Sequence, residues 1–118
     1  MAEGAIFVGW GAAIPGREKS SLEVFTESVQ FWTQKQQQGE ITSFEVFALE
    51  PHGGDLLGFA LIRGDQDTLT RLRYSPDVVR LDNRAATVVQ NFGVVTAFPP
   101  DQVQQFYQSY QQDIADLV

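Results

Sequence analysis

The chain contains no cysteine, only one histidine and few basic residues. Its 118 residues include eight Lys and Arg against fifteen Asp and Glu, which gives a net charge of −7. Without cysteine there can be no disulfide, no thiolate nucleophile and no cysteine-based zinc or iron–sulfur site. An acidic surface also repels a phosphate backbone. We therefore expect no metal centre and no nucleic-acid partner.

Long hydrophobic runs are also missing. No apolar stretch approaches the ~20 residues of a membrane-spanning helix, and residues 1–14 lack the basic start and the long apolar core of a signal peptide. Apolar residues make up 43% of the chain and charged residues 19%, as in ordinary folded proteins. The sequence predicts one acidic, soluble domain over residues 1–118, cytoplasmic and without a membrane partner.

One stretch resembles a nucleotide-binding loop. Residues 9–20 read GWGAAIPGREKS, with two glycines at the spacing of a phosphate loop. That loop requires a lysine directly after the second glycine, but here Arg17 and Glu18 come before Lys19. Because Glu18 would bring a negative charge toward the anion, we interpret the stretch as a turn from a strand into a helix.

Hydrophobic periodicity predicts the order of the remaining elements. A strand over 5–14 precedes a helix over 17–38, whose apolar stripe contains Leu22, Phe25, Val29 and Trp32. Two strands over 41–50 and 56–63 flank a turn over 51–55. A helix capped or restarted at Ser75 and Pro76 ends near residue 89, and a strand over 92–98 precedes a last helix over 100–117. The last helix either packs on its own sheet edge or reaches a partner subunit.

This order predicts an α+β fold of the ferredoxin-like type, in which helices cover one face of a four-stranded antiparallel sheet. A hairpin turn of two or four residues would place Phe44 and Val46 with Leu57 and Phe59 under the helices. A three-residue turn would instead move Leu57, Phe59, Leu61 and Arg63 to the other face. Either way that face is too apolar to remain in water. We therefore expect a homodimer that forms through the open sheet face.

In the order of its elements and in its two apolar sheet faces, the chain resembles the dimeric α+β barrel superfamily. The ferredoxin-like protomers of that superfamily pair sheet against sheet around a shared interior. The superfamily includes cofactor-free monooxygenases, haem-binding members and isomerases. Its haem-binding members generally use an axial histidine from the domain body, whereas His52 lies in the predicted hairpin turn. The resemblance thus implies a dimer and a cavity, and we expect no cofactor.

Four residues are candidates for a ligand site in that interior. Trp10 could form a wall, beside Phe47. Glu45 could act as a general acid or base, or could pair with Arg63 at the dimer rim. His52 is a weaker catalytic candidate because a loop leaves it exposed.

Two functions remain open from the sequence. The first is a small dimeric protein that binds a small apolar molecule between the paired sheets. The second is a cofactor-independent monooxygenase or isomerase that acts on a small apolar or aromatic substrate.

Overall fold

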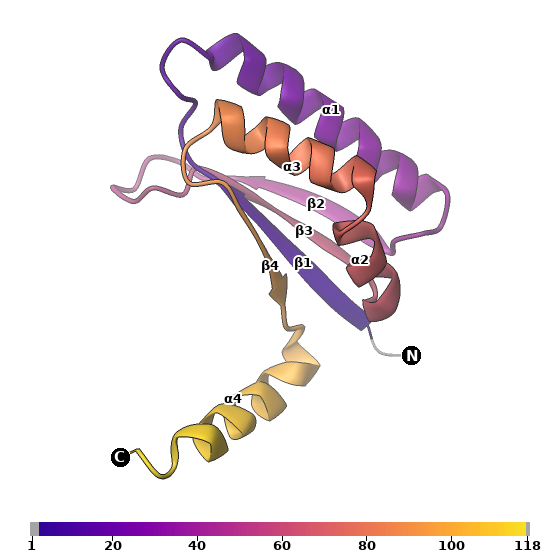
Figure 1. Ribbon diagram of the computed structural model, residues 1–118, viewed down its shortest axis with the longest axis vertical. Helices are drawn as coiled ribbons and strands as arrows, with labels where there is room; N and C mark the ends of the chain where they lie inside the picture. Colours follow the sequence, from indigo (N-terminus) through magenta and orange to yellow (C-terminus); the bar gives the residue numbers. More distant parts are fainter. Residues whose placement is uncertain (1–2, 118) are drawn as a thin grey trace.

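A four-stranded antiparallel sheet forms the centre of the molecule in the computed structural model, which describes residues 3–117 (Figure 1). Its strands are β1 (Glu3–Trp10), β2 (Ser43–Ala48), β3 (Gly58–Asp65) and β4 (Gly93–Ala97), arranged in the order β2-β3-β1-β4. This order and the intervening helices confirm the predicted ferredoxin-like α+β fold. Residues 1, 2 and 118 of the predicted domain lie outside the described residues.

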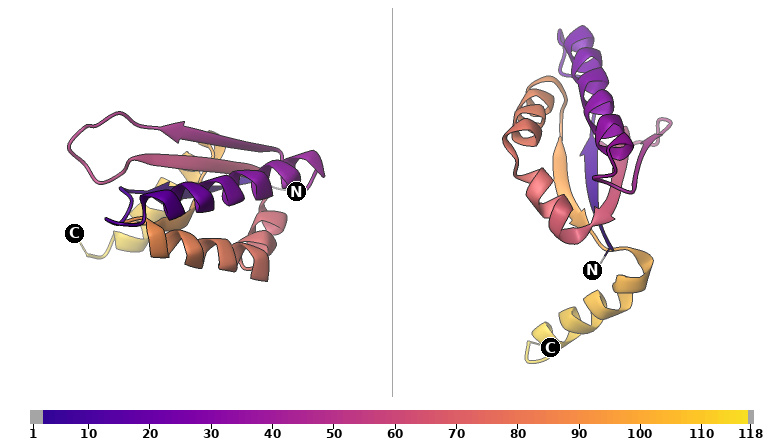
Figure 2. Two further views of the ribbon diagram at one scale, coloured as in Figure 1. Left: turned by 90° about the horizontal axis from the view of Figure 1, so that it is seen from above. Right: turned by 90° about the vertical axis from the view of Figure 1, so that its right-hand side faces the viewer.

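Three helices cover one face of the sheet: α1 (Glu18–Gln37), α2 (Gln66–Arg73) and α3 (Pro76–Val88) (Figure 2). Local signals set their ends. Ser75 caps α3 by accepting a hydrogen bond from the Val78 amide, and Pro76 occupies the first turn, where no amide donor is needed. Gly39 follows α1 with a φ of 79°, a left-handed conformation that suits glycine. No helix among the described residues is long and apolar enough to cross a membrane.

The hydrophobic core lies between the sheet and these helices. Ile6 of β1 and Ile62 of β3 are directly opposite each other in the sheet and are buried against Trp32 of α1 and Leu69 of α2. Neighbouring residues of one strand point to opposite faces of the sheet. The strand residues that alternate with Ile6 and Ile62 therefore form a second surface, on the side that the helices do not cover.

The register of the hairpin follows the second of the two sequence-based alternatives. Phe47 is opposite Phe59, and Ser43 is opposite Arg63. Phe44 and Val46 face the helices as expected, but Phe59 and Leu61 point to the open face. The connection spans residues 49–57 and contains a further backbone pairing, from the Leu49 amide to the Leu57 carbonyl at 2.9 Å. This longer connection, rather than a tight five-residue turn, sets the register.

The open face carries a row of aromatic rings. Phe59 stacks between Phe7 and Phe47, with ring centroids 5.3 and 4.9 Å apart. Leu61 and Val95 extend the apolar surface, and Phe47 and Val95 are 41% and 54% exposed. Within one chain this face has no covering layer among the described residues.

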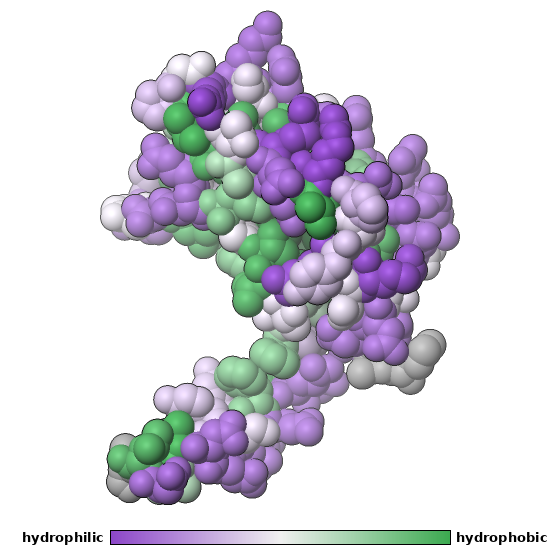
Figure 3. All heavy atoms as spheres, viewed as in Figure 1, coloured by the Kyte–Doolittle hydropathy of each residue, from purple (hydrophilic) through white to green (hydrophobic). Residues whose placement is uncertain are grey.

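The last helix, α4 (Pro100–Ile114), extends away from the body (Figure 1). None of its residues is buried. Two contacts hold its start: Gln102 donates a hydrogen bond to the Glu3 carbonyl at 2.7 Å, and Phe106 packs on Phe98. Apolar residues gather over β4 and again at the tip of α4 (Figure 3). The helix therefore does not lie along its own sheet edge.

Candidate ligand-binding site

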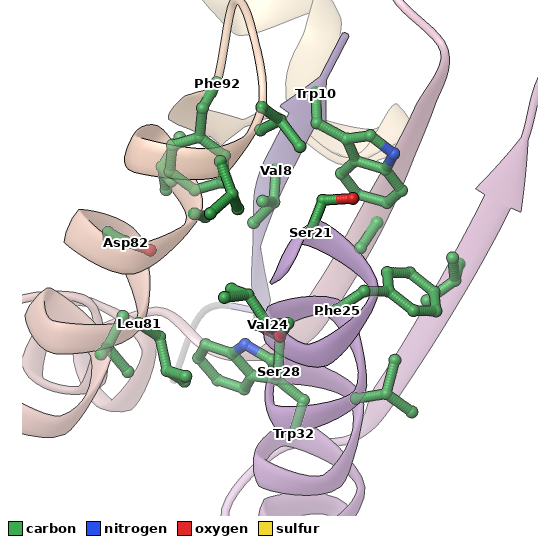
Figure 4. Close-up of a pocket in the computed structure, with 18 of the residues that line it drawn as sticks. Val8, Trp10, Ser21, Val24, Phe25, Ser28, Trp32, Leu81, Asp82 and Phe92 are labelled. Atoms are coloured by element: carbon green, nitrogen blue, oxygen red, sulfur yellow. Dashed lines mark hydrogen bonds between the residues drawn. The ribbon is translucent and has the colours of Figure 1, made fainter. Parts of the chain in front are cut away.

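A cavity of about 240 Å³ lies between the helix-covered face of the sheet and helices α1 and α3 (Figure 4). Small side chains leave this space. Ser21 and Ser28 of α1 line it, together with Ala60 of β3 and Ala85 of α3. A large apolar residue at any of these positions would fill part of the space, because protein interiors otherwise pack to high density.

Trp10 forms one end of the cavity. Its indole packs edge-on against Phe25, with centroids 6.0 Å apart, and it lies over Gly58 of the neighbouring strand. A Cβ at Gly58 would come within 2.7 Å of the indole ring and 3.0 Å of the Phe47 carbonyl. Gly58 is therefore required for the position of the Trp10 wall.

The α1 side of the cavity differs from the predicted stripe. Leu22 is 67% exposed and Phe25 is 42% exposed, whereas Val24 and Trp32 are buried. Of the predicted stripe, Trp32 is buried but Leu22 and Phe25 are exposed, and Val24, which lies outside that stripe, is the other buried residue of α1. Leu22 and Phe25 instead line the cavity where it meets solvent, together with Val46 and Leu57.

Asp82 is the acidic group of the cavity. It lies on α3 beside Leu81, and the surrounding apolar residues shield it partly from water. Burial raises the pKa of Asp82 above its ordinary value, and the positive charge of Arg73 opposes this shift. Arg73 is held in place by β4, since its guanidinium donates to the Val94 carbonyl at 3.0 Å and to the Thr96 hydroxyl at 3.2 Å.

Across the cavity, Trp32 presents an indole N–H group. Its side chain is 6% exposed, and its nitrogen makes no hydrogen bond to any residue within 3–117. Figure 4 shows the ring reaching from α1 toward α3, close to Ser28. The Ser28 hydroxyl already donates to the Val24 carbonyl at 2.9 Å. Trp32 thus contributes to the cavity an N–H donor that has no protein partner among these residues.

The predicted site residues do not come together. Trp10 lines the cavity, while Glu45, Phe47 and Arg63 lie on the opposite, open face of the sheet. Glu45 and Arg63 form no ion pair with each other, and among residues 3–117 the Nε atom of Arg63 is buried without a hydrogen-bond partner. Glu45 is directly opposite Leu61, and Arg63 is directly opposite Ser43, so the two residues are diagonal neighbours on the open face. Their pairing at a dimer rim stays a prediction.

His52 lies in the exposed connection between β2 and β3. Its ring contacts the Leu56 carbonyl at 2.8 Å and accepts from the Gly54 amide at 3.3 Å. These bonds hold the connection in shape, away from the cavity. Within the described part of the chain, no three His, Asp or Glu side chains gather as metal ligands.

The turn that resembles a phosphate loop is organised differently. The Gly16 amide, which would face a phosphate, donates instead to the Glu18 carboxylate at 3.3 Å. Gly16 has a φ of 87°, so the second glycine provides the left-handed turn that leads into α1. The sequence-based interpretation as a strand-to-helix turn is confirmed.

Sequence reasoning missed Asp82 and Ser28 as cavity residues. Asp82 follows Leu81 and precedes Ala85 by three positions, which places it beside the apolar stripe of α3. Ser28 lies one residue before Val29 of the predicted stripe, and its polar side chain does not contribute to the apolar periodicity of the helix. A polar residue that interrupts an inward stripe is the signal that could have found both.

Comparisons with known proteins bear on the fold. No protein-family model and no curated sequence matches the chain. A dabb family protein with a ferredoxin-like fold from Mesorhizobium loti is 15% identical, with a TM-score of 0.63 over 83% of this chain and 98% of that one. A dimeric ferredoxin-like protein of unknown function from Jannaschia is 13% identical, with a TM-score of 0.63 over 83% of this chain and 100% of the other.

A cofactor-independent oxygenase from Streptomyces nogalater is also similar. It is 17% identical, with a TM-score of 0.52 over 83% of this chain and 96% of that chain. At these identities the likeness establishes the fold. The resemblance inferred from the order of elements is confirmed at this level: the chain has the ferredoxin-like fold found in dimeric α+β barrel proteins.

Proposed function

We propose that the protein binds a small apolar, aromatic molecule in the cavity between the sheet and helices α1 and α3, and that it does so as a homodimer. The cavity itself carries the ligand proposal. Its wall is mainly apolar and aromatic with a few polar groups, as in small-molecule sites. An apolar cavity of about 150 Å³ is enough to hold benzene, so about 240 Å³ leaves room for a second fused ring.

This location differs from the one expected from the sequence. The ligand was expected between two paired sheets, whereas the cavity lies on the helix-covered face of a single chain. Trp10 keeps its proposed role as a wall, while Phe47 and Arg63 belong to the dimer proposal. Each protomer would therefore hold its own ligand.

Homodimerisation through the open face is supported by the aromatic row of Phe7, Phe59 and Phe47. An apolar surface of this kind marks an interface, and a two-fold axis would place the same surface against itself. The similar proteins from Bacteroides fragilis and Jannaschia are described as dimeric. Glu45 and Arg63 flank the row with opposite charges that do not pair within the chain.

A cofactor-independent monooxygenase or isomerase is the second candidate function. Asp82 favours it, because a partly desolvated carboxylate with a raised pKa is suited to accept a proton from a bound substrate. The structural likeness to the Streptomyces nogalater oxygenase is consistent with this alternative. Oxygen uptake with hydroxylated aromatic substrates, lost in Asp82→Asn, would support the enzyme, and binding without turnover would favour the binding protein.

The ligand proposal is tested with naphthalene as the probe, by following the emission of the two tryptophans, Trp10 and Trp32, which both line the cavity. Ser28→Leu fills the cavity and should weaken binding at least ~10-fold, since the ligand and the new side chain compete for one volume. Ser20→Leu is the matched control, because Ser20 is an exposed serine of the same helix. Equal binding by both variants would place the site elsewhere, and no binding by the wild type would refute the proposal.

A further inference from the structure

Asp82 and Trp32 are two polar residues of the cavity whose side chains make no hydrogen bond to any residue from 3 to 117. Asp82 makes no hydrogen bond or ion pair with any residue from 3 to 117, although it is partly buried. The Trp32 indole N–H is likewise unpartnered in a side chain that is more than nine-tenths buried. Neither group is among the fully buried atoms without a hydrogen-bond partner, which within residues 3–117 are Glu40 Oε2 and Arg63 Nε, so both groups remain accessible to a ligand that enters the cavity.

The two groups come from different walls. Asp82 projects from α3 and Trp32 from α1, and both line the same cavity (Figure 4). Three other polar groups of the cavity are at least partly engaged: Ser28 donates to the Val24 carbonyl, Ser21 donates to the Glu18 carbonyl, and Arg73 uses two of its N–H groups on β4. Asp82 is thus the carboxylate, and Trp32 the buried indole N–H, that a ligand in this cavity would find without a protein partner among residues 3–117.

We propose that Asp82 and Trp32 are the polar anchors of the ligand, and that the ligand class is hydroxylated aromatic molecules. An ionised carboxylate only accepts hydrogen bonds and an indole N–H only donates. A hydroxyl group is the smallest substituent that offers both a donor and an acceptor. The aromatic body would occupy the apolar remainder, between Trp10 and Val24.

The charge of Arg73 argues against a cationic amine as the donor. Arg73 lies close enough to Asp82 to act on it electrostatically, so a ligand ammonium group would meet a positive charge already in place. A neutral hydroxyl donor avoids that repulsion. The inference rests on the proposed function, since it assumes that the cavity is a ligand site.

The experiment compares 1-naphthol with naphthalene, which differ by one hydroxyl group. We expect the wild type to bind 1-naphthol roughly tenfold more tightly, because hydrogen bonds to charged groups exceed neutral ones in strength. In Asp82→Leu, which keeps the side-chain size and removes the acceptor, that preference should vanish while naphthalene binding persists. Asp82→Ala serves as a second variant, and Trp32→Phe should reduce the preference by removing the donor.

Asp77→Leu is the matched control, since Asp77 is an exposed aspartate of the same helix and should retain the preference for 1-naphthol. If neither probe binds the wild type, the proposed function itself fails. If naphthalene binds and is blocked by Ser28→Leu, but the preference for 1-naphthol is absent or survives both Asp82 variants, the anchor proposal alone is overturned.

Discussion

Gly58 is the β3 residue on which the Trp10 indole packs, so a side chain at this position would contact the cavity wall. Replacing it by alanine would force Trp10 to move, because the new Cβ would lie 2.7 Å from the indole and 3.0 Å from the backbone oxygen of Phe47. We expect Gly58→Ala to lower the free energy of unfolding by about 1–3 kcal/mol, the usual cost of overpacking, and to weaken naphthalene binding. Chemical denaturation and probe titration measure the two effects.

Gly93 provides the control for this substitution. It is also a sheet glycine, but a Cβ there would meet no atom within 4 Å. Gly93→Ala should therefore change stability by no more than about 0.5 kcal/mol. Equal losses in the two variants would mean that the crowding of Trp10 is not the cause.

Individual side chains were the hardest feature to predict from the sequence. The face of the sheet to which Trp10 points depends on how β1 pairs with β3. That pairing cannot be predicted from a single sequence. Ser28 and Ala60 both line the cavity, and their small side chains leave space there. Small side chains add no signal to the hydrophobic periodicity. The periodicity therefore predicts the apolar core around the cavity but does not predict the cavity.

Among the elements, helices and strand order were predictable because their signals are local. Ser75 and Pro76 mark the start of α3, and Gly39 marks the end of α1. The register of β2 and β3 was not predictable, because it depends on how many residues of the connection continue to pair. The bond between Leu49 and Leu57 shows that pairing extends beyond both strands.

Helix α4 is the element that contributes least to the folded body. It buries none of its residues, and its main attachments are the contacts of Gln102 with Glu3 and of Phe106 with Phe98. Deleting residues 100–118 should therefore change the free energy of unfolding by less than about 1 kcal/mol. Thermal unfolding of the full chain and the truncated chain at equal concentration measures this.

A large loss of stability on truncation would show that α4 packs against the body or a partner in solution. The exposed apolar side of α4, which includes Val103, Tyr107 and Tyr110, makes the concentration dependence of that loss informative. A loss confined to high protein concentration would identify contacts between chains.

For the whole molecule, the decisive property is its state of association. We expect light scattering at micromolar concentration to show a dimer, and Phe47→Glu to convert it to a monomer. A carboxylate within an apolar interface costs several kcal/mol because it loses its hydration. Val46→Glu is the neighbouring control: Val46 faces the helices, so this variant should remain dimeric. A monomeric wild type would contradict the prediction.

The sequence does predict that both faces of the sheet must be covered, since both carry apolar side chains. It does not predict that the cavity lies on the helix-covered face and the stacked aromatic row on the open face. Ser21, Ser28 and Ala85 lie on the helices that cover one face and line its cavity, whereas the other face has no covering layer among residues 3–117. The hydrophobic periodicity of one chain predicts an apolar face but does not predict how two chains would pack on it.

The alternation along β3 has a consequence for how this chain can change over time. Phe59 and Leu61 point outward, while Ala60 and Ile62 point toward the cavity or core. Point substitutions can thus alter assembly or ligand choice separately, one residue apart. An insertion or deletion of a single residue within the strand would exchange the two sets and damage both properties at once. We would expect natural variation in β3 to proceed by replacement and length variation to accumulate in residues 49–57.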